Sequence, residues 1–174
     1  MTREQVTAEI PLTEREYRNT IGLFATGVTV IALGDTDNIR AMTANALASL
    51  SLDPLLVIFC IDRTANCADY FRFNENFSIN ILYRNQEVLS NYFAGIWPDD
   101  APPPEFEFVP WQGCSRLRKA MAALNCTLQE KLEGGDHWIM VGQVAGLWRA
   151  DDLSDPLLYY RGQYHGLADT NCAD

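Results

Sequence analysis

Residues suited to chemistry are concentrated in three separate stretches of the sequence. The first, residues 43–54, has the sequence TANALASLSLDP and combines small hydroxyl and amide side chains with almost no charge. Main-chain N–H groups and Ser or Thr hydroxyls in such a segment can bind a polar, anionic ligand. We therefore expect a binding edge here; an ordinary loop of small residues between two strands is the alternative.

The two histidines of the chain lie in the other two stretches. His137 follows the sequence GGD at the entrance to an expected strand, where its ring could project toward a ligand; a surface-turn histidine is the alternative. His165 ends residues 159–165, YYRGQYH, whose aromatic rings and arginine could stack a planar ring and hold a phosphate. A C-terminal strand that covers the core with tyrosines is the alternative for this segment.

Other chemistries have weaker support. A nucleophilic pair of His137 with Cys60 or Cys126 is conceivable, although free cysteines in apolar strands are usually packing residues. The five cysteines have no CxxC spacing, and neither a disulfide framework nor a metal site is expected. The sequence also has no GxGxxG, GxxxxGK[ST], HExxH or GxSxG pattern. A Rossmann domain, a P-loop, a zincin and the common hydrolase elbow are therefore unsupported.

Strands with a few short helices must position these stretches. Capping signals and apolar periodicity predict helices at 14–23, 64–74 and 86–93, and strands at 27–33, 39–43, 55–61, 77–82, from 124 onward and at 137–144. The strand at 55–61 is apolar on both faces, as in a strand buried on each side. Residues 97–111 contain five prolines, which predicts an irregular surface excursion acting as a lid, a subunit contact or a docking surface.

Composition limits the class of protein. The 174 residues are expected to form one mostly β domain, a small barrel of five to seven strands with two or three helical covers, flanked by a flexible arm at 1–12 and a flexible tail at 168–174. The net charge of -10 disfavours nucleic acid and anionic membranes as partners. The charged first sixteen residues are unlike a signal peptide, so a cytoplasmic protein is expected.

Four segments in register resemble the flavin reductase-like family of FMN-binding split β-barrels. They are FATGVTV at 24–30, residues 42–54, FSINIL at 77–82, and GDH at 135–137 with the tail at 160–165. The better-known members of this family are the small reductase components of two-component aromatic monooxygenases. The chain departs from the family pattern at Leu55, where many members have a second proline, and at residues 113–115 after Trp111.

The resemblance implies a homodimer that binds flavin near the subunit interface and passes hydride from NADH or NADPH to FMN or FAD. It implies a flavin-binding wall formed by Thr26, Thr43, Ala44, Asn45, Ala46, Ser49, Ser51, Cys60, Ile61, Asp62, Asn80 and Leu82. His137, the catalytic candidate, is expected to position the nicotinamide first and to donate a proton second. Three further residues complete the nicotinamide side: Arg161, Tyr164 and His165.

The expected function is to supply reduced flavin to a partner monooxygenase. One alternative is a flavoprotein that retains FMN and reduces another acceptor, such as a metal ion or a corrinoid. Another is a non-catalytic flavin-binding protein without a nicotinamide groove. An interaction module that has lost flavin is the last alternative, and it predicts a colourless protein.

Overall fold

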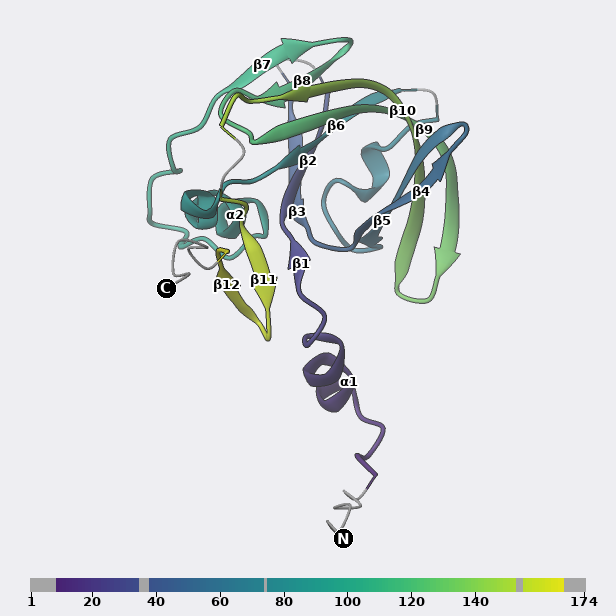
Figure 1. Ribbon diagram of the computed structural model, residues 1–174, viewed down its shortest axis with the longest axis vertical. Coiled ribbons are helices and arrows are strands. Elements are labelled where there is room, and N and C mark those ends of the chain that lie inside the picture. The colour runs from purple at the N-terminus through teal and green to yellow at the C-terminus, as the bar shows by residue number, and fades with distance from the viewer. Residues whose placement is uncertain (1–8, 35–37, 74, 153–154, 168–174) are drawn as a thin grey trace, which may run out of the picture.

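The computed structural model describes residues 9–34, 38–73, 75–152 and 155–167 (Figure 1). Residues 1–8 of the expected arm, the whole expected tail and Cys172 therefore lie outside the described residues. The main element is a seven-stranded sheet in the order β3-β2-β6-β9-β10-β5-β4. Its strands are β2 Thr29–Leu33, β3 Arg40–Ala44, β4 Leu47–Leu52, β5 Leu55–Asp62, β6 Asn76–Ile81, β9 Ala122–Gly134 and β10 His137–Arg149.

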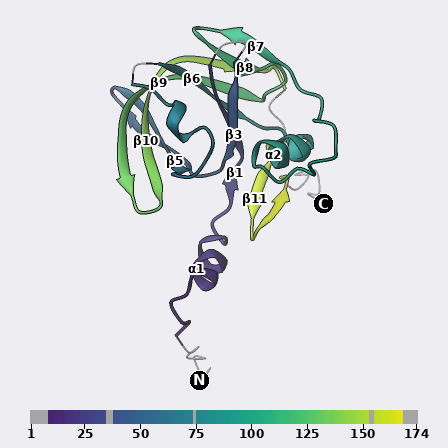
Figure 2. The same cartoon turned by 180° about the vertical axis from the view of Figure 1, so that it is seen from behind.

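This sheet is antiparallel throughout and curls around its own interior (Figures 1 and 2). The curling brings β3 into contact with β5, five places away in the strand order. Register shifts interrupt the β9–β10 and β4–β5 pairs, and such bulges bend strands and increase their twist. The expected mostly β barrel is confirmed.

Two small sheets and two α-helices lie outside the barrel. One small sheet joins β1 Thr26–Gly27 to the hairpin of β11 Leu158–Tyr160 and β12 Gln163–His165, and the other pairs β7 Phe108–Trp111 with β8 Cys114–Leu117. The α-helices are α1 Glu14–Ile21 and α2 Glu87–Phe93, and short 3₁₀ helices span Ala68–Tyr70 and Arg84–Gln86. The described residues thus form twelve strands, more than the expected five to seven, because two- to four-residue strands leave no alternating pattern long enough to detect.

The main core fills the barrel interior around three phenylalanines. Phe59, Phe71 and Phe77 are at most 5% exposed, and their ring centroids are 5.5 to 5.6 Å apart. Tilted and edge-to-face contacts of this kind add to the free energy gained by burying the rings. A second cluster, which includes Val30, Leu89 and Leu117, packs the sheet against α2.

Of two expectations about segments between the main strands, one is wrong and the other holds in part. The helix expected at 64–74 is wrong: among the described residues of this segment only the 3₁₀ turn Ala68–Tyr70 forms, although Ala68 and Phe71 are buried. The irregular excursion expected at 97–111 holds for residues 97–107, and the last four residues form β7. Phe106 and Phe108 pack on Phe93 of α2 with ring centroids 5.1 and 6.0 Å away, so the segment is fixed by aromatic packing.

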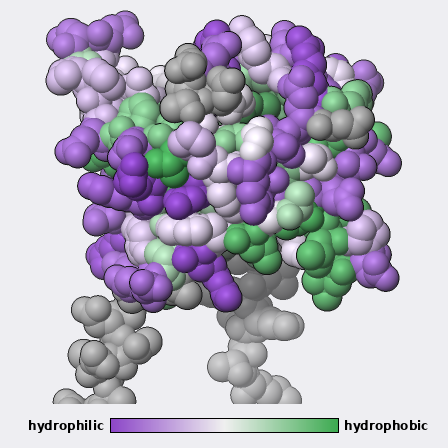
Figure 3. Space-filling model, turned by 90° about the horizontal axis from the view of Figure 1, so that it is seen from above, coloured by the Kyte–Doolittle hydropathy of each residue, from purple (hydrophilic) through white to green (hydrophobic). Residues whose placement is uncertain are grey.

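Helix α1 stands apart from the barrel (Figures 1 and 2). It begins as expected, with the Thr13 hydroxyl accepting a hydrogen bond from the Glu16 N–H at 3.2 Å, and Gly22 caps its end. None of its side chains is buried, and Tyr17 and Phe24 are 62% and 73% exposed. The face seen from above in Figure 3 is by contrast mainly hydrophilic, with scattered apolar patches. No helix within the described part of the chain is long and apolar enough to span a membrane.

Candidate functional site

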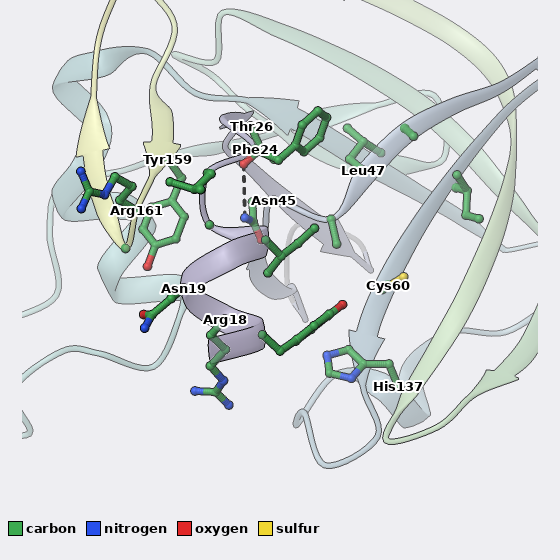
Figure 4. Close-up of a pocket in the computed structure, with 18 residues that line it drawn as sticks. Arg18, Asn19, Phe24, Thr26, Asn45, Leu47, Cys60, His137, Tyr159 and Arg161 are labelled. Atoms are coloured by element: carbon green, nitrogen blue, oxygen red, sulfur yellow. Dashed lines mark hydrogen bonds between the residues drawn. The ribbon is translucent and has the colours of Figure 1, made fainter. Parts of the chain in front are cut away.

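A cavity of about 1150 Å³ lies between α1, the β11–β12 turn and the outer face of β4, β5 and β10 (Figure 4). Pockets for single small ligands usually measure about 300–1,000 Å³. The cavity is therefore large enough for more than one ring system. Residues 97–111 contribute nothing to its lining.

One wall of the cavity is built by strand pairing. Ala48 lies opposite Ile58, and Cys60 lies opposite Ile139, in the β4–β5 and β5–β10 registers. Residues directly opposite in an antiparallel pair project to the same face, and alternate residues of one strand project to opposite faces. Ile58 and Cys60 therefore line the cavity, while Val57, Phe59 and Ile61 fill the core. The result is a mainly aliphatic wall against which a planar ring can pack.

A polar edge borders this wall. The side-chain amide of Asn45 donates a hydrogen bond of 3.2 Å to the Thr26 hydroxyl, which links the β3–β4 turn to β1 (Figure 4). The turn itself is closed by main-chain bonds from the Leu47 N–H to the Asn45 carbonyl and from the Cys60 N–H to the Ala46 carbonyl. Amide, hydroxyl and main-chain groups at a ring edge can hydrogen bond to ring nitrogens and carbonyls without introducing charge.

The opposite wall comes from α1 and the β11–β12 hairpin. It includes Tyr17, Arg18 and Asn19 from the helix and Tyr159 and Arg161 from the hairpin. The hairpin turn consists of Arg161 and Gly162, both with positive φ (52° and 77°), as two-residue hairpin turns of the primed types require. The Arg161 N–H donates to the Gly22 carbonyl at 2.8 Å, which attaches the end of α1 to the hairpin tip.

His137 lies at the far end of the sheet wall, at the start of β10. Its Nδ1 is 2.7 Å from an Asp136 carboxylate oxygen, and its side chain is 43% exposed. This contact holds the pKa of Asp136 below its ordinary value, with the hydrogen bond as the largest cause. A carboxylate on Nδ1 orients the ring and leaves Nε2 available to a ligand.

The turn of the β9–β10 hairpin, which carries His137, is attached to the end of β5. The Arg63 N–H donates to the Asp136 carbonyl at 3.1 Å, and the Arg63 guanidinium lies 4.3 Å from the Trp138 ring centroid. Lys131 lies 4.5 Å from the same centroid. Cation–π contacts with Trp are the strongest of their kind. They fix Trp138, the next residue of β10, and thereby help to hold His137 in place.

The structure brings six of the expected site residues together around the cavity. They are Thr26, Asn45, Ala46, Cys60, His137 and Arg161. These residues come from five parts of the chain, so only the fold makes them neighbours. The binding edge expected within residues 43–54 is in part a strand, because residues 47–52 form β4.

Four expected residues are buried away from the cavity. Ala44, Ile61 and Leu82 belong to the two hydrophobic clusters. The Asn80 amide donates to the Val30 carbonyl at 3.0 Å and accepts from the Leu117 N–H at 2.9 Å, which satisfies it inside the barrel. The expectation that residues 55–61 form a strand buried on both faces is wrong, because only one face of β5 is buried.

The remaining expected residues make other contacts. The Thr43 hydroxyl donates to the Ser90 carbonyl of α2, and the Tyr164 hydroxyl contacts the Ser90 and Asn91 side chains. The other four lie outside the cavity lining of the single chain: Ser49 and Ser51 on the edge strand β4, Asp62 with its carboxylate bound to Thr64, and His165 on the exposed hairpin.

The structure gives little support to thiol or metal chemistry. Burial raises the pKa of Cys126 to about 12, which keeps that thiol protonated in the core. Cys60 shares the cavity with His137, but the structure records no hydrogen bond between these two described residues. Among the described residues no group of three potential metal ligands occurs.

Local sequence patterns did not indicate the helical wall of the cavity. Tyr17, Arg18 and Asn19 line the cavity but were not among the expected site residues. A usable signal existed in the apolar spacing of Tyr17, Ile21 and Phe24, which marks one face of a short helix. That signal could not indicate what the face lies against.

Comparison with known proteins decides the family. Residues 21–168 match the family model described as flavin reductase like domain. The chain belongs to the flavin reductase like domain family. The match covers every strand of the barrel and the cavity wall that they form, so the expected resemblance is confirmed.

Individual members of the flavin reductase like domain family are similar over most of their length. An NADH-dependent flavin reductase from Rhodococcus sp is 36% identical over 159 residues, which cover 90% of this chain and 88% of that protein. The reductase subunit HsaB of a flavin-dependent monooxygenase from Rhodococcus jostii (strain RHA1) is 31% identical, covering 96% and 85%. The solved structure of flavin reductase PheA2 in its native state superposes with a TM-score of 0.83 at 35% identity, covering 91% of this chain and all of that one. The expected split barrel is confirmed by this likeness.

Proposed function

We propose that this protein is an NADH-dependent flavin reductase that supplies reduced FMN or FAD to a partner monooxygenase. NADH gives up a hydride, and the flavin takes it together with a proton from water, which leaves NAD⁺ and reduced flavin. The observation that carries the proposal is the large cavity, which has an aliphatic wall, a polar edge and His137 at one end.

The residues of the cavity fit a flavin. The aliphatic faces of Ile58 and Ala48 can pack against an isoalloxazine ring, and Asn45 and Thr26 offer an amide and a hydroxyl at its polar edge. A bound flavin supplies the hydride-accepting ring, so the chain needs no catalytic acid or base for that step. Its work is to hold two rings in contact and to exclude water.

We assign His137 to the nicotinamide side. Its ring lies on the same sheet face as Cys60, two positions along the β5–β10 register, at the end of the wall that we assign to the flavin. Asp136 fixes the orientation of the imidazole through Nδ1. His137 then positions the nicotinamide, and donation of a proton from Nε2 is its secondary role.

We further propose that the working unit is a homodimer. Three apolar residues that line the cavity, Ile21, Leu23 and Phe24, are each more than half exposed in the single chain. Edge strand β4 adds Leu50 and Leu52, which are 49% and 82% exposed. A second copy that covers these residues would remove them from water and narrow the cavity. The cytoplasmic location expected from the sequence stays a prediction.

The decisive experiment measures NADH oxidation by the purified protein, first without added flavin and then with FMN, FAD or riboflavin added. Turnover that rises and saturates with an added flavin is expected, and it should be slower with NADPH. A yellow protein whose bound flavin bleaches with NADH, but which ignores added flavin, would instead support the retained-flavin alternative. Absence of NADH oxidation with every flavin, despite flavin binding, would favour the non-catalytic alternative.

Delivery to a partner needs a separate measurement. A monooxygenase component that depends on reduced flavin is expected to hydroxylate its substrate when this protein, NADH and oxygen are supplied together. Omitting this protein is the control. If NADH oxidation is fast but this protein supports hydroxylation by no such component, the proposed partner is refuted. The proposed reductase activity is not affected by that outcome.

A further inference from the structure

A buried serine joins α2 to the strands β3 and β12. Ser90 is fully buried, and none of the described residues of α2 lines the cavity, so Ser90 cannot touch a ligand there. We infer that Ser90, Thr43 and Tyr164 are positioning residues, which set the flavin affinity by fixing the pair of Asn45 and Thr26. The inference rests on the proposed function and extends the same site to residues that make no ligand contact.

The first route from Ser90 to this pair runs through β3. The Thr43 hydroxyl donates to the Ser90 carbonyl at 2.7 Å, and the Ala94 N–H donates to the same oxygen at 2.9 Å. A carbonyl oxygen has two lone pairs, so it accepts the hydroxyl without losing the helical bond. Thr43 is two residues before Asn45, next to the end of β3. This bond therefore fixes the strand end from which the turn carrying Asn45 begins.

The second route runs through the small sheet of β1, β11 and β12. The Tyr164 hydroxyl donates to the Asn91 side-chain oxygen at 3.2 Å, so in its 2.9 Å contact with the Ser90 hydroxyl the serine donates. The Tyr164 ring lies edge-to-face on the Tyr159 ring, with centroids 5.2 Å apart. Such contacts favour one relative orientation of the two rings. Because Tyr159 lines the cavity, the bonds to α2 fix a ring of the cavity wall.

Strand register continues the second route to the polar edge of the cavity. Tyr159 lies directly opposite Tyr164 in the β11–β12 pair and directly opposite Thr26 in the β1–β11 pair. Directly opposite residues of antiparallel strands project to the same face, so the three side chains form one row across the small sheet. The row ends at the Thr26 hydroxyl, which accepts from the Asn45 amide (Figure 4). The two routes therefore form a closed circuit of contacts from Ser90 to Asn45 and back.

The circuit matters because Asn45 itself is exposed. Its amide spends one N–H on the Thr26 hydroxyl, which leaves the carbonyl oxygen and the second N–H for a ligand. A side chain that is already held in one orientation loses less conformational freedom when a ligand binds. Removing a hydroxyl of the circuit should therefore weaken flavin binding although no contact with the flavin is lost.

The test measures FMN binding by fluorescence titration in the wild type, Tyr164→Phe and Thr43→Val. Each substitution removes one hydroxyl and keeps the size of the side chain. Tyr160→Phe is the matched control, because Tyr160 follows Tyr159 on β11, projects to the opposite face of the small sheet and lies outside the cavity lining. Each variant is also combined with Asn45→Ala, so that double-mutant cycles measure whether the hydroxyl acts through Asn45.

Tyr164→Phe and Thr43→Val should each weaken FMN binding about threefold, within the range for one lost hydrogen bond. In the Asn45→Ala background they should change the dissociation constant less than about 1.5-fold, since the side chain that they position is absent. Tyr160→Phe should change neither value. Ser90→Ala should reproduce the effect of Tyr164→Phe, and it provides a second variant of this route if that one does not fold.

Equal weakening of FMN binding in both backgrounds would overturn the inference, because the hydroxyls would then act on the fold as a whole. Unchanged FMN binding in both hydroxyl variants would do the same. In either case, wild-type protein that binds FMN and oxidises NADH shows that the proposed function survives. Wild-type protein that binds no flavin would refute the proposed function and the inference with it. Asn45→Ser replaces Asn45→Ala if the alanine variant binds too little FMN to titrate.

Discussion

Replacing His137 with alanine should raise the KM for NADH while flavin binding stays nearly constant. The imidazole lies at the end of the sheet wall with Asp136 on its Nδ1, where it can stack on a nicotinamide. Contacts between aromatic rings contribute about 0.5–1.5 kcal/mol beyond the burial of area. The side chain is 43% exposed, which favours the lower half of that range.

A loss of about 0.7 kcal/mol corresponds to roughly a threefold higher KM for NADH, since about 1.4 kcal/mol is tenfold. The flavin dissociation constant should change less than about twofold, within the ±0.5 kcal/mol of a substitution that removes no contact. Steady-state NADH oxidation at saturating FMN gives the first value, and fluorescence titration with FMN gives the second. His165→Ala is the matched control, because His165 lies outside the cavity lining.

Equal losses of NADH affinity and FMN affinity in His137→Ala would refute the assignment, because the histidine would then act on the flavin or on the fold. The same conclusion follows if His165→Ala reproduces the effect. A selective fall in kcat, without a change in the KM for NADH, would make proton donation the main role of His137.

Three further predictions concern the core, an ion pair and a thiol. Phe59→Ala should lower the free energy of unfolding by about 3–5 kcal/mol in urea titrations, because the fully buried ring contacts two other phenylalanines; a loss under about 1 kcal/mol would contradict this core assignment. Arg118 holds the pKa of Glu107 below its ordinary value of 4.5, so the stability from this pair is present above that pH and is lost as the pH falls through the lowered pKa. Glu107→Gln should therefore reduce the acid dependence of Tm in that range, and an unchanged dependence would show that the pair contributes nothing. Cys60 should react with iodoacetamide and be protected by FMN, whereas Cys126 should react only after unfolding; mass spectrometry identifies the labelled thiols, and labelling of Cys60 at the same rate with FMN bound would contradict its place at the ring.

Much of the barrel could be predicted from local patterns. The strands β6 and β10 begin within one residue of the expected positions, because alternating side chains and flanking turn residues are properties of a short segment. The start of α1 could be predicted equally well, since Thr13 and Glu16 interact within one turn. The helix expected at 64–74 failed because buried Ala68 and Phe71 can be packed by a loop as well as by a helix.

The candidate site was predictable only in part. His137 and Asn45 could be predicted as site residues because their neighbours in the sequence carry the family pattern. Asn80 belongs to the same pattern, yet its amide satisfies buried main-chain groups inside the barrel. Local sequence does not distinguish a polar residue facing a ligand from one facing the backbone of its own core.

The sequence by itself therefore determined the β class, the approximate strands and the family, because each depends on short-range periodicity or on residues in register. Tertiary structure alone decided which face of β5 lines the cavity, since residues 55–61 are apolar on both faces and only pairing with β4 and β10 orients them. It also decided that α1 forms the opposite wall, because the bond from Arg161 to Gly22 joins segments about 140 residues apart. Contacts between such distant segments depend on the folding of everything between them, which no local pattern encodes.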